Sequence, residues 1–210
     1  MQTLLQFWHS FRRLPSAWLL LVQLALLVLA MLTYGDSAYR AISWSLGVLA
    51  LLIIAKVIRQ SPIFTFWGLF FVGGAFVFSV LIIFGFHHPA VQISAYSFEA
   101  LAYFYAAYGL LRYMFADRYL TKDELFAAGA VFTLIAWGFA FLYSICQILL
   151  PHSFQNSNQP QALQAWLDLL FLSFSLQSAT GLSDLIPISP AARVLTMLQM
   201  FGGAMSFAVI

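Results

Sequence analysis

Residues 178–187 read SATGLSDLIP and separate two strongly apolar segments of the chain. Gly181 and Pro187 are among the poorest helix formers, so one helix is expected to end here before another begins. Irregular backbone is tolerated at membrane depth only where protein buries it or water reaches it. If the flanking segments lie in a bilayer, this stretch is therefore either a loop that merely joins them or backbone arranged to handle ions.

The overall composition places the chain in a lipid bilayer. It has 210 residues, of which 63% are hydrophobic and 8% are charged. Soluble domains carry roughly 25% charged residues, and a helix that crosses a bilayer needs about 20 consecutive apolar residues. Six segments approach or exceed that length: 18–34, 41–58, 62–86, 90–115, 124–150 and 190–210. We therefore expect an all-α, multi-pass protein of the cell membrane with six transmembrane helices.

A seventh apolar segment lies between the fifth and sixth spans. The polar stretch 151–161 is followed by residues 163–177, which are too few to cross comfortably. We expect a re-entrant pore helix over 163–178 that delivers its C-terminal end to the loop. A helix C-terminus carries partial negative charge and favours a nearby cation. The carbonyl oxygens of the loop can then replace the hydration water of an ion, as in carbonyl-built filters.

The basic residues predict the orientation. With a cytoplasmic N-terminus, only Arg40 and Arg193 lie outside, and the inner side holds Arg12, Arg13, Lys56, Arg59, Arg112, Arg118 and Lys122. This distribution follows the positive-inside rule. Ahead of the first span, apolar residues of 1–17 recur at helical spacing. They predict an interfacial helix on the inner surface, with an unstructured tail as the alternative.

The run ATGLSDLIP at 179–187 resembles the pore loop of the tetrameric potassium-channel superfamily. The filter of that family reads T-V-G-Y-G-D, with a proline three residues after the Asp. The five filter positions are taken here by Ala179, Thr180, Gly181, Leu182 and Ser183, and Asp184 and Pro187 match the family's Asp and Pro. The resemblance covers about residues 164–210 and implies a homotetramer, because one pore loop cannot enclose a pore. It also implies that the permeant species is a monovalent cation, K⁺ or Na⁺.

The departures from the family pattern predict a divergent filter. The first filter Thr of the family is Ala179 here, the bracing aromatic is Leu182, and the second Gly is Ser183. A Ser in a backbone region reserved for glycine costs on the order of 1–3 kcal/mol. We therefore expect the outer half of the filter not to copy the family, and selectivity for potassium to be weak. A ring of four Asp184 carboxylates would still favour cations at the mouth.

Four further residues are candidates for roles beyond simple packing. Glu99 is a carboxyl group inside a span, with either a gating or ion-linked role or a structural role as a hydrogen-bonded acid. Asp168 lies in the expected pore helix and is a candidate for supporting the filter through a hydrogen bond. Gln199 either lines an inner cavity or makes an interhelical hydrogen bond. The resemblance places Gly203 at the family's inner-helix hinge, and close helix packing is the alternative.

These predictions divide the chain into a peripheral four-helix unit, 18–115, and a pore domain, 124–210. The pore domain comprises an outer helix, the pore helix, the filter 179–184 and the inner helix 190–210. Arg112 is the single basic residue of the fourth span, so the peripheral unit carries no gating charges. We interpret the chain as a passive cation channel. A nonconducting channel-like scaffold and, less favoured, a secondary transporter are the alternatives. The sequence holds no catalytic motif, cofactor site, metal-ligand set or nucleic-acid-binding cluster, so we expect no enzyme.

Overall fold

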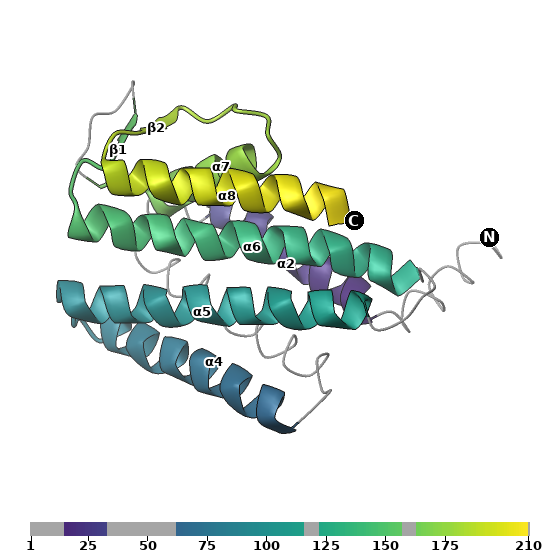
Figure 1. Cartoon of the computed structure of the whole chain (residues 1–210). Helices are drawn as coiled ribbons and strands as arrows, with labels where there is room; N and C mark the ends of the chain where they lie inside the picture. The colour runs from purple at the N-terminus through teal and green to yellow at the C-terminus, as the bar shows by residue number, and fades with distance from the viewer. Residues whose placement is uncertain (1–14, 33–61, 116–121, 157–162, 210) are drawn as a thin grey trace.

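The computed structural model describes residues 15–32, 62–115, 122–156 and 163–209 (Figure 1). This part of the chain is helical apart from two short strands, which confirms the all-α prediction for the described residues. In chain order the elements are α2 (Pro15–Leu32), α4 (Pro62–Ile83), α5 (Pro89–Met114), α6 (Lys122–Leu149), β1 (Phe154–Asn156), α7 (Trp166–Gln177), β2 (Leu185–Pro187) and α8 (Pro190–Val209). The predicted span 41–58 and nearly all of the predicted interfacial helix 1–17 lie outside the described residues.

Prolines fix where most of these helices begin. Pro15, Pro62, Pro89 and Pro190 are the first residues of α2, α4, α5 and α8. At the first helical position proline is favoured, because its missing N–H would have no partner inside the helix and its φ angle is already helical. Serine completes the start of α8, where the Ser189 hydroxyl accepts a hydrogen bond from the N–H of Ala192 at 3.2 Å. Its backbone carbonyl also accepts the N–H of Arg193 at 3.0 Å.

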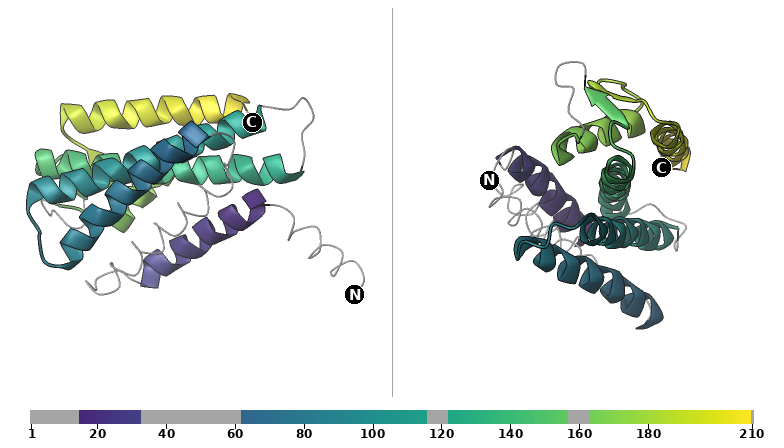
Figure 2. Two further views of the ribbon diagram at one scale, coloured as in Figure 1. Left: turned by 90° about the horizontal axis from the view of Figure 1, so that it is seen from below. Right: turned by 90° about the vertical axis from the view of Figure 1, so that its left-hand side faces the viewer.

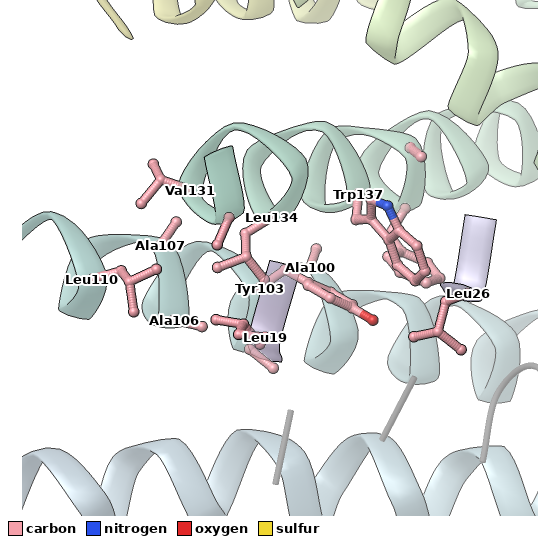
Figure 3. Close-up of a cluster of buried hydrophobic side chains, with 14 of the residues drawn as sticks. Leu19, Leu26, Ala100, Tyr103, Ala106, Ala107, Leu110, Val131, Leu134 and Trp137 are labelled. Carbon is pink, nitrogen blue, oxygen red and sulfur yellow. The ribbon is translucent and has the colours of Figure 1, made fainter. Parts of the chain in front are cut away.

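Helix α6 is the central element of the fold and contacts α2, α5, α7 and α8 (Figures 1 and 2). The main apolar core lies between α2, α5 and α6, and its labelled members include Leu19, Leu26, Tyr103, Leu110, Leu134 and Trp137 (Figure 3). Small residues of α5 and α6 let these two helices approach closely, since Ala107 and Ala130 are almost entirely buried. A second, smaller core surrounds Tyr143, Phe154 and Leu169 and ties the strands to α6 and α7.

The start of α2, the end of α5 and the start of α6 meet at one end of the bundle. Asp123 joins them, because its carboxylate accepts the Ser16 N–H at 3.1 Å, the Ser16 hydroxyl at 2.8 Å and the Tyr113 hydroxyl at 3.2 Å. The opposite end carries the paired strands β1 and β2 and the start of α8. The starts of α2 and α6 therefore lie at the end of the bundle opposite to the start of α8.

Two of the described helices contain stretches long and apolar enough to cross a membrane, Phe66–Ile83 in α4 and Asp123–Leu149 in α6. They have different surroundings, because α6 is largely buried whereas α4 packs mainly on α5 and leaves most of its surface uncovered. The uncovered side of α4 is apolar and aromatic, with Phe66 65% and Phe76 51% exposed. Such a surface is typical of a helix that faces lipid or another apolar partner.

Helix α7 reaches only halfway along α6. Near its start, the Gln164 N–H donates to Gln147 Oε1 at 2.8 Å, close to the end of α6. At its end, Gln177 Nε2 donates to the Phe132 carbonyl oxygen, near the middle of α6, at 2.8 Å. The chain then returns without helical structure to β2, which pairs antiparallel with β1. The prediction of a short helix over 163–178 followed by an irregular loop is therefore close to the observed α7 and its return segment.

Candidate functional site

The candidate site is the return segment, residues 178–184, which begins with a specific helix cap. The Ala179 N–H donates to the Leu176 carbonyl at 3.2 Å, and the Thr180 N–H donates to the Ser175 carbonyl at 3.0 Å. These two bonds form a Schellman motif, which requires a left-handed residue between Ser178 and Thr180. Ala179 fills that position with φ of 56°. The first predicted filter residue is therefore the left-handed residue that follows the C-cap, Ser178, and ends α7.

Ser175 holds most of the return segment. Its carbonyl accepts the N–H groups of Thr180 and Gly181, the latter at 3.3 Å, and also the Thr180 hydroxyl at 3.3 Å. Its own hydroxyl accepts the N–H of Ser183 at 3.2 Å. Ser175 is buried, so these bonds are shielded from competing water. The position of the segment consequently depends on the last turn of α7.

Two residues of the return segment, one of them a glycine, have left-handed backbone conformations. Gly181 has φ of 66°, so together with Ala179 it brackets Thr180 between two left-handed residues. Ser183 is not one of the residues with positive φ. Its side chain instead accepts the Leu185 N–H at 3.1 Å and starts the return toward β2. The left-handed positions of the return segment thus lie at 179 and 181.

Most of the predicted filter residues lie on the surface of the chain. Ala179, Thr180, Gly181 and Asp184 are exposed, and Leu182 is 70% exposed. Ser178 Oγ donates to the Phe174 carbonyl at 2.7 Å and lies 3.0 Å from Thr180 Oγ1. The Thr180 hydroxyl also lies 3.3 Å from the Ser175 carbonyl, so both hydroxyl groups are held against the last turn of α7. Two hydroxyl oxygens at the negative end of α7 form an environment that favours a cation.

Asp168 and Asp184 lie close enough for their charges to interact. Asp168 is in the first turn of α7 and is half-buried. Burial raises the pKa of its carboxyl group, a backbone hydrogen bond at Ala165 lowers the pKa, and the Asp184 carboxylate raises it further. The structure therefore brings Asp168 within electrostatic range of Asp184, and no hydrogen bond joins the two carboxyl groups in the described part of the chain.

Gln199 is fully buried and makes interhelical hydrogen bonds, which is the second of the two roles predicted for it. Its Nε2 donates to the Ser173 carbonyl at 3.0 Å, to the Ser173 hydroxyl at 2.6 Å and to Gln177 Oε1 at 3.2 Å. Its Oε1 accepts the Tyr143 hydroxyl. These bonds connect α8 to α7 and α6. They are expected because the oxygen and the nitrogen of a buried amide both need hydrogen-bond partners.

Gly203 is likewise a packing position in this structure. A Cβ atom built on it would lie 2.7 Å from the Gln177 carbonyl oxygen and 3.0 Å from the Gln177 Cα. The absence of a side chain therefore lets α8 lie directly against the backbone at the end of α7. The neighbouring Gly202 differs, since no described atom lies within 4 Å of a Cβ built there.

Glu99 lies apart from the return segment, between α4 and α5. It is buried, and Glu99 Oε1 accepts a long hydrogen bond of 3.4 Å from the Ser79 hydroxyl, which also donates to the Ala75 carbonyl at 2.6 Å. Among the described residues, Glu99 Oε2 has no hydrogen-bond partner. The structure therefore does not bring Glu99 together with the other predicted site residues.

Sequence reasoning missed the polar residues that organise the site from behind. Ser173, Ser175 and Gln177 are all buried at every second position of α7, and the buried Tyr143 of α6 donates its hydroxyl to Gln199, which in turn contacts Ser173 and Gln177. The signal that would have found them is the run LSFSLQ, where polar residues recur at every second position of an otherwise apolar helix. In an apolar environment each such residue needs a specific partner.

Comparison of the chain with protein-family models, with curated proteins and with solved structures finds no match. The residues themselves, and their geometry, therefore carry the functional argument.

Proposed function

We propose that the chain is one subunit of a homotetrameric membrane channel that conducts monovalent cations passively, with the return segment 178–184 of each copy facing a common axis. The observation that carries this proposal is the exposure of that segment in the isolated chain. Irregular backbone and hydroxyl groups at the half-way depth of α6 need either protein or water around them, because lipid offers no hydrogen bonds. Neighbouring copies and an aqueous path supply both.

The exposed face of α8 supports assembly beside this segment. Its buried side points to α6 and α7, whereas its other side exposes apolar residues: Val194, Met197, Leu198, Phe201 and Met205. An apolar helix face adjacent to a polar segment fits contact with another copy better than contact with lipid alone. The resemblance of residues 164–210 to the potassium-channel pore module gives the number of copies as four.

Local charge supports a cation as the permeant species. The C-terminal end of α7 carries partial negative charge, and the oxygens of Ser178 and Thr180 lie at that end. Asp184 is exposed at the outer end of the same segment. Fourfold repetition would produce a ring of carboxylates, which attracts cations and repels anions. The hydroxyl oxygens of Ser178 and Thr180 support a divergent filter. So does Ser183, which stands at the second glycine position of the family and does not have a positive φ.

The proposed topology has six spans with a cytoplasmic N-terminus. Asp123 gathers the start of α2, the end of α5 and the start of α6 at one end of the bundle, which is the end that the positive-inside rule assigns to the cytoplasm. Arg112 lies in the last turn of α5 at this end, whereas Arg193 lies in the first turn of α8 at the opposite end. Residues 41–58 supply the remaining span in this proposal.

The test is conduction by the purified protein in planar bilayers. We expect unitary currents, and reversal potentials under ion substitution that show cation preference with weak discrimination of K⁺ from Na⁺. Asp184→Asn should lower the cation conductance severalfold at about 10 mM salt and much less at about 1 M salt, because the screening length falls from about 30 Å to about 3 Å. Asp184→Glu is the matched control, since it keeps the charge and should keep the conductance.

Each alternative predicts a different result. Slow, saturable flux without unitary currents would identify a transporter, and an assembled protein without flux would identify a scaffold. A monomeric mass in detergent and in nanodiscs would overturn the fourfold arrangement. Equal conductance of Asp184→Asn and the wild type at low salt would remove the carboxylate ring from the proposal.

A further inference from the structure

A buried polar network links α8 to the helix that carries the return segment, and Gln199 is its centre. The Gln199 side chain is completely buried and contacts Ser173, Gln177 and Tyr143 through hydrogen bonds. Its amide has two N–H donors and one carbonyl acceptor, so the observed contacts use all of its polar atoms. Satisfied buried networks of this kind favour one arrangement of the helices that they join.

The network ends at the last residue of α7. Gln177 accepts from Gln199 through Oε1 and donates through Nε2 to the Phe132 carbonyl of α6. The backbone of Gln177 also lies directly against Gly203, where a Cβ would be 2.7 Å from its carbonyl oxygen. Two points on α8, one turn apart, therefore fix the C-terminal end of α7.

The return segment is attached to this same turn. Ser175 lies two residues before Gln177, and it accepts the N–H groups of Thr180, Gly181 and Ser183. A displacement of the last turn of α7 would therefore move Ser175, the acceptor of three hydrogen bonds that hold the segment. The route from Gln199 to the segment passes through Gln177 and Ser175 without any contact between Gln199 and the segment.

We propose that Gln199 is a positioning residue for the return segment, so that the geometry presented to a permeating cation depends on an amide of α8 that does not touch the ion. The inference rests on the proposed channel function for its effect on ions. The structural link itself, from Gln199 to the amides of Thr180, Gly181 and Ser183, is independent of conduction and is tested separately.

Amide hydrogen exchange on the full-length protein tests the link. Gln199→Met keeps the length and volume of the side chain but removes its donors and acceptor. We expect exchange at Thr180, Gly181 and Ser183 to become about tenfold faster, since local opening would no longer break a satisfied buried network. Thr196→Val is the matched control: Thr196 is also buried on α8, but its hydroxyl donates to the Arg193 carbonyl of its own helix at 2.9 Å.

The results separate positioning from general destabilisation. Unchanged exchange in Gln199→Met, or an equal acceleration in Thr196→Val, overturns the inference. If Gln199→Met does not fold, Tyr143→Phe removes only the hydroxyl that Gln199 Oε1 accepts and should accelerate the same three amides by a smaller factor. Unchanged exchange in that variant would also overturn the inference.

Ion-substitution recordings test the functional consequence. In channels that assemble, Gln199→Met should change the ratio of K⁺ to Na⁺ permeability at least twofold, whereas Thr196→Val should leave the ratio unchanged. A purely structural role predicts fewer channels with the wild-type ratio, which contradicts positioning of the segment. A wild-type protein without currents refutes the proposed function, and the exchange measurements still decide whether Gln199 positions the segment.

Discussion

Substitution of two adjacent glycines by alanine tests how closely α8 lies against α7. Gly202 and Gly203 occupy the same helix, so alanine gives both the same intrinsic gain in helix propensity of about 1 kcal/mol. Their surroundings differ, because a Cβ at Gly203 would lie 2.7 Å from the Gln177 carbonyl oxygen and one at Gly202 has no described atom within 4 Å. The difference between the two variants therefore isolates the packing contribution.

The magnitude follows from the closeness of the contact. Backbone atoms of Gln177 cannot swing aside like the end of a flexible side chain, so α8 or the end of α7 must move. Overpacking of this kind costs about 1–3 kcal/mol. We expect Gly202→Ala to be neutral or stabilising by up to about 1 kcal/mol, and Gly203→Ala to lie about 1–3 kcal/mol below Gly202→Ala in stability. For a chain of this size that difference corresponds to roughly 2–4 °C in Tm per kcal/mol.

Thermal unfolding of both variants in the same detergent provides the measurement, with the wild type alongside. A hinge at Gly203 predicts altered open probability with little change in stability. Close packing predicts a lower Tm for Gly203→Ala than for Gly202→Ala. Equal Tm values for the two variants, or a higher value for Gly203→Ala, would refute the argument that the Gln177 backbone excludes a side chain at Gly203.

Substitutions at three further positions give predictions for the same thermal assay. Ala179→Gly should stabilise the protein by about 1 kcal/mol, because glycine adopts the left-handed cap without strain, and Ala179→Thr should destabilise it; the reverse order would contradict the Schellman cap. Glu99→Leu should be neutral or stabilising by about 1–2 kcal/mol, since it removes an unpaired buried oxygen; a clear loss of stability would show that Glu99 has a partner. Asp123→Ala should cost about 2–3 kcal/mol by leaving the Ser16 hydroxyl and N–H buried without an acceptor, and an unchanged Tm would contradict the role of Asp123 in joining three helices.

Helix boundaries were predictable because the sequence marks them with strong local signals. The predicted span 190–210 corresponds to α8 at Pro190–Val209, and the predicted segment 62–86 contains α4 at Pro62–Ile83. In both cases a proline fixes the start and an apolar run fixes the length. The short helix predicted over 163–178 corresponds to α7 at Trp166–Gln177, and its start is harder to predict because its N-cap, Ala165, makes no side-chain hydrogen bond.

The conformation at Ala179 could not be predicted from the sequence. Alanine has the highest helix propensity and rarely adopts positive φ, so its type favours continuation of the helix. The position instead follows from the bonds that end α7, with Leu176 and Ser175 accepting the next N–H groups. Alignment to a filter motif compares residue types at each position, and it does not show that one of those residues is used to cap the preceding helix.

The sequence also leaves two roles open for Gln199 and for Gly203, for a related physical reason. Helical spacing places both on one face of α8, but spacing cannot show whether that face meets the same chain, another copy or water. The structure shows that this face meets α6 and α7, while the apolar residues on the other side remain exposed. In the proposed tetramer, α8 would therefore contact neighbouring copies through one face and hold the end of α7 through the other. Subunit contacts and the geometry of the return segment would then depend on the same helix, so assembly would influence the path of the ion without requiring a separate regulatory domain.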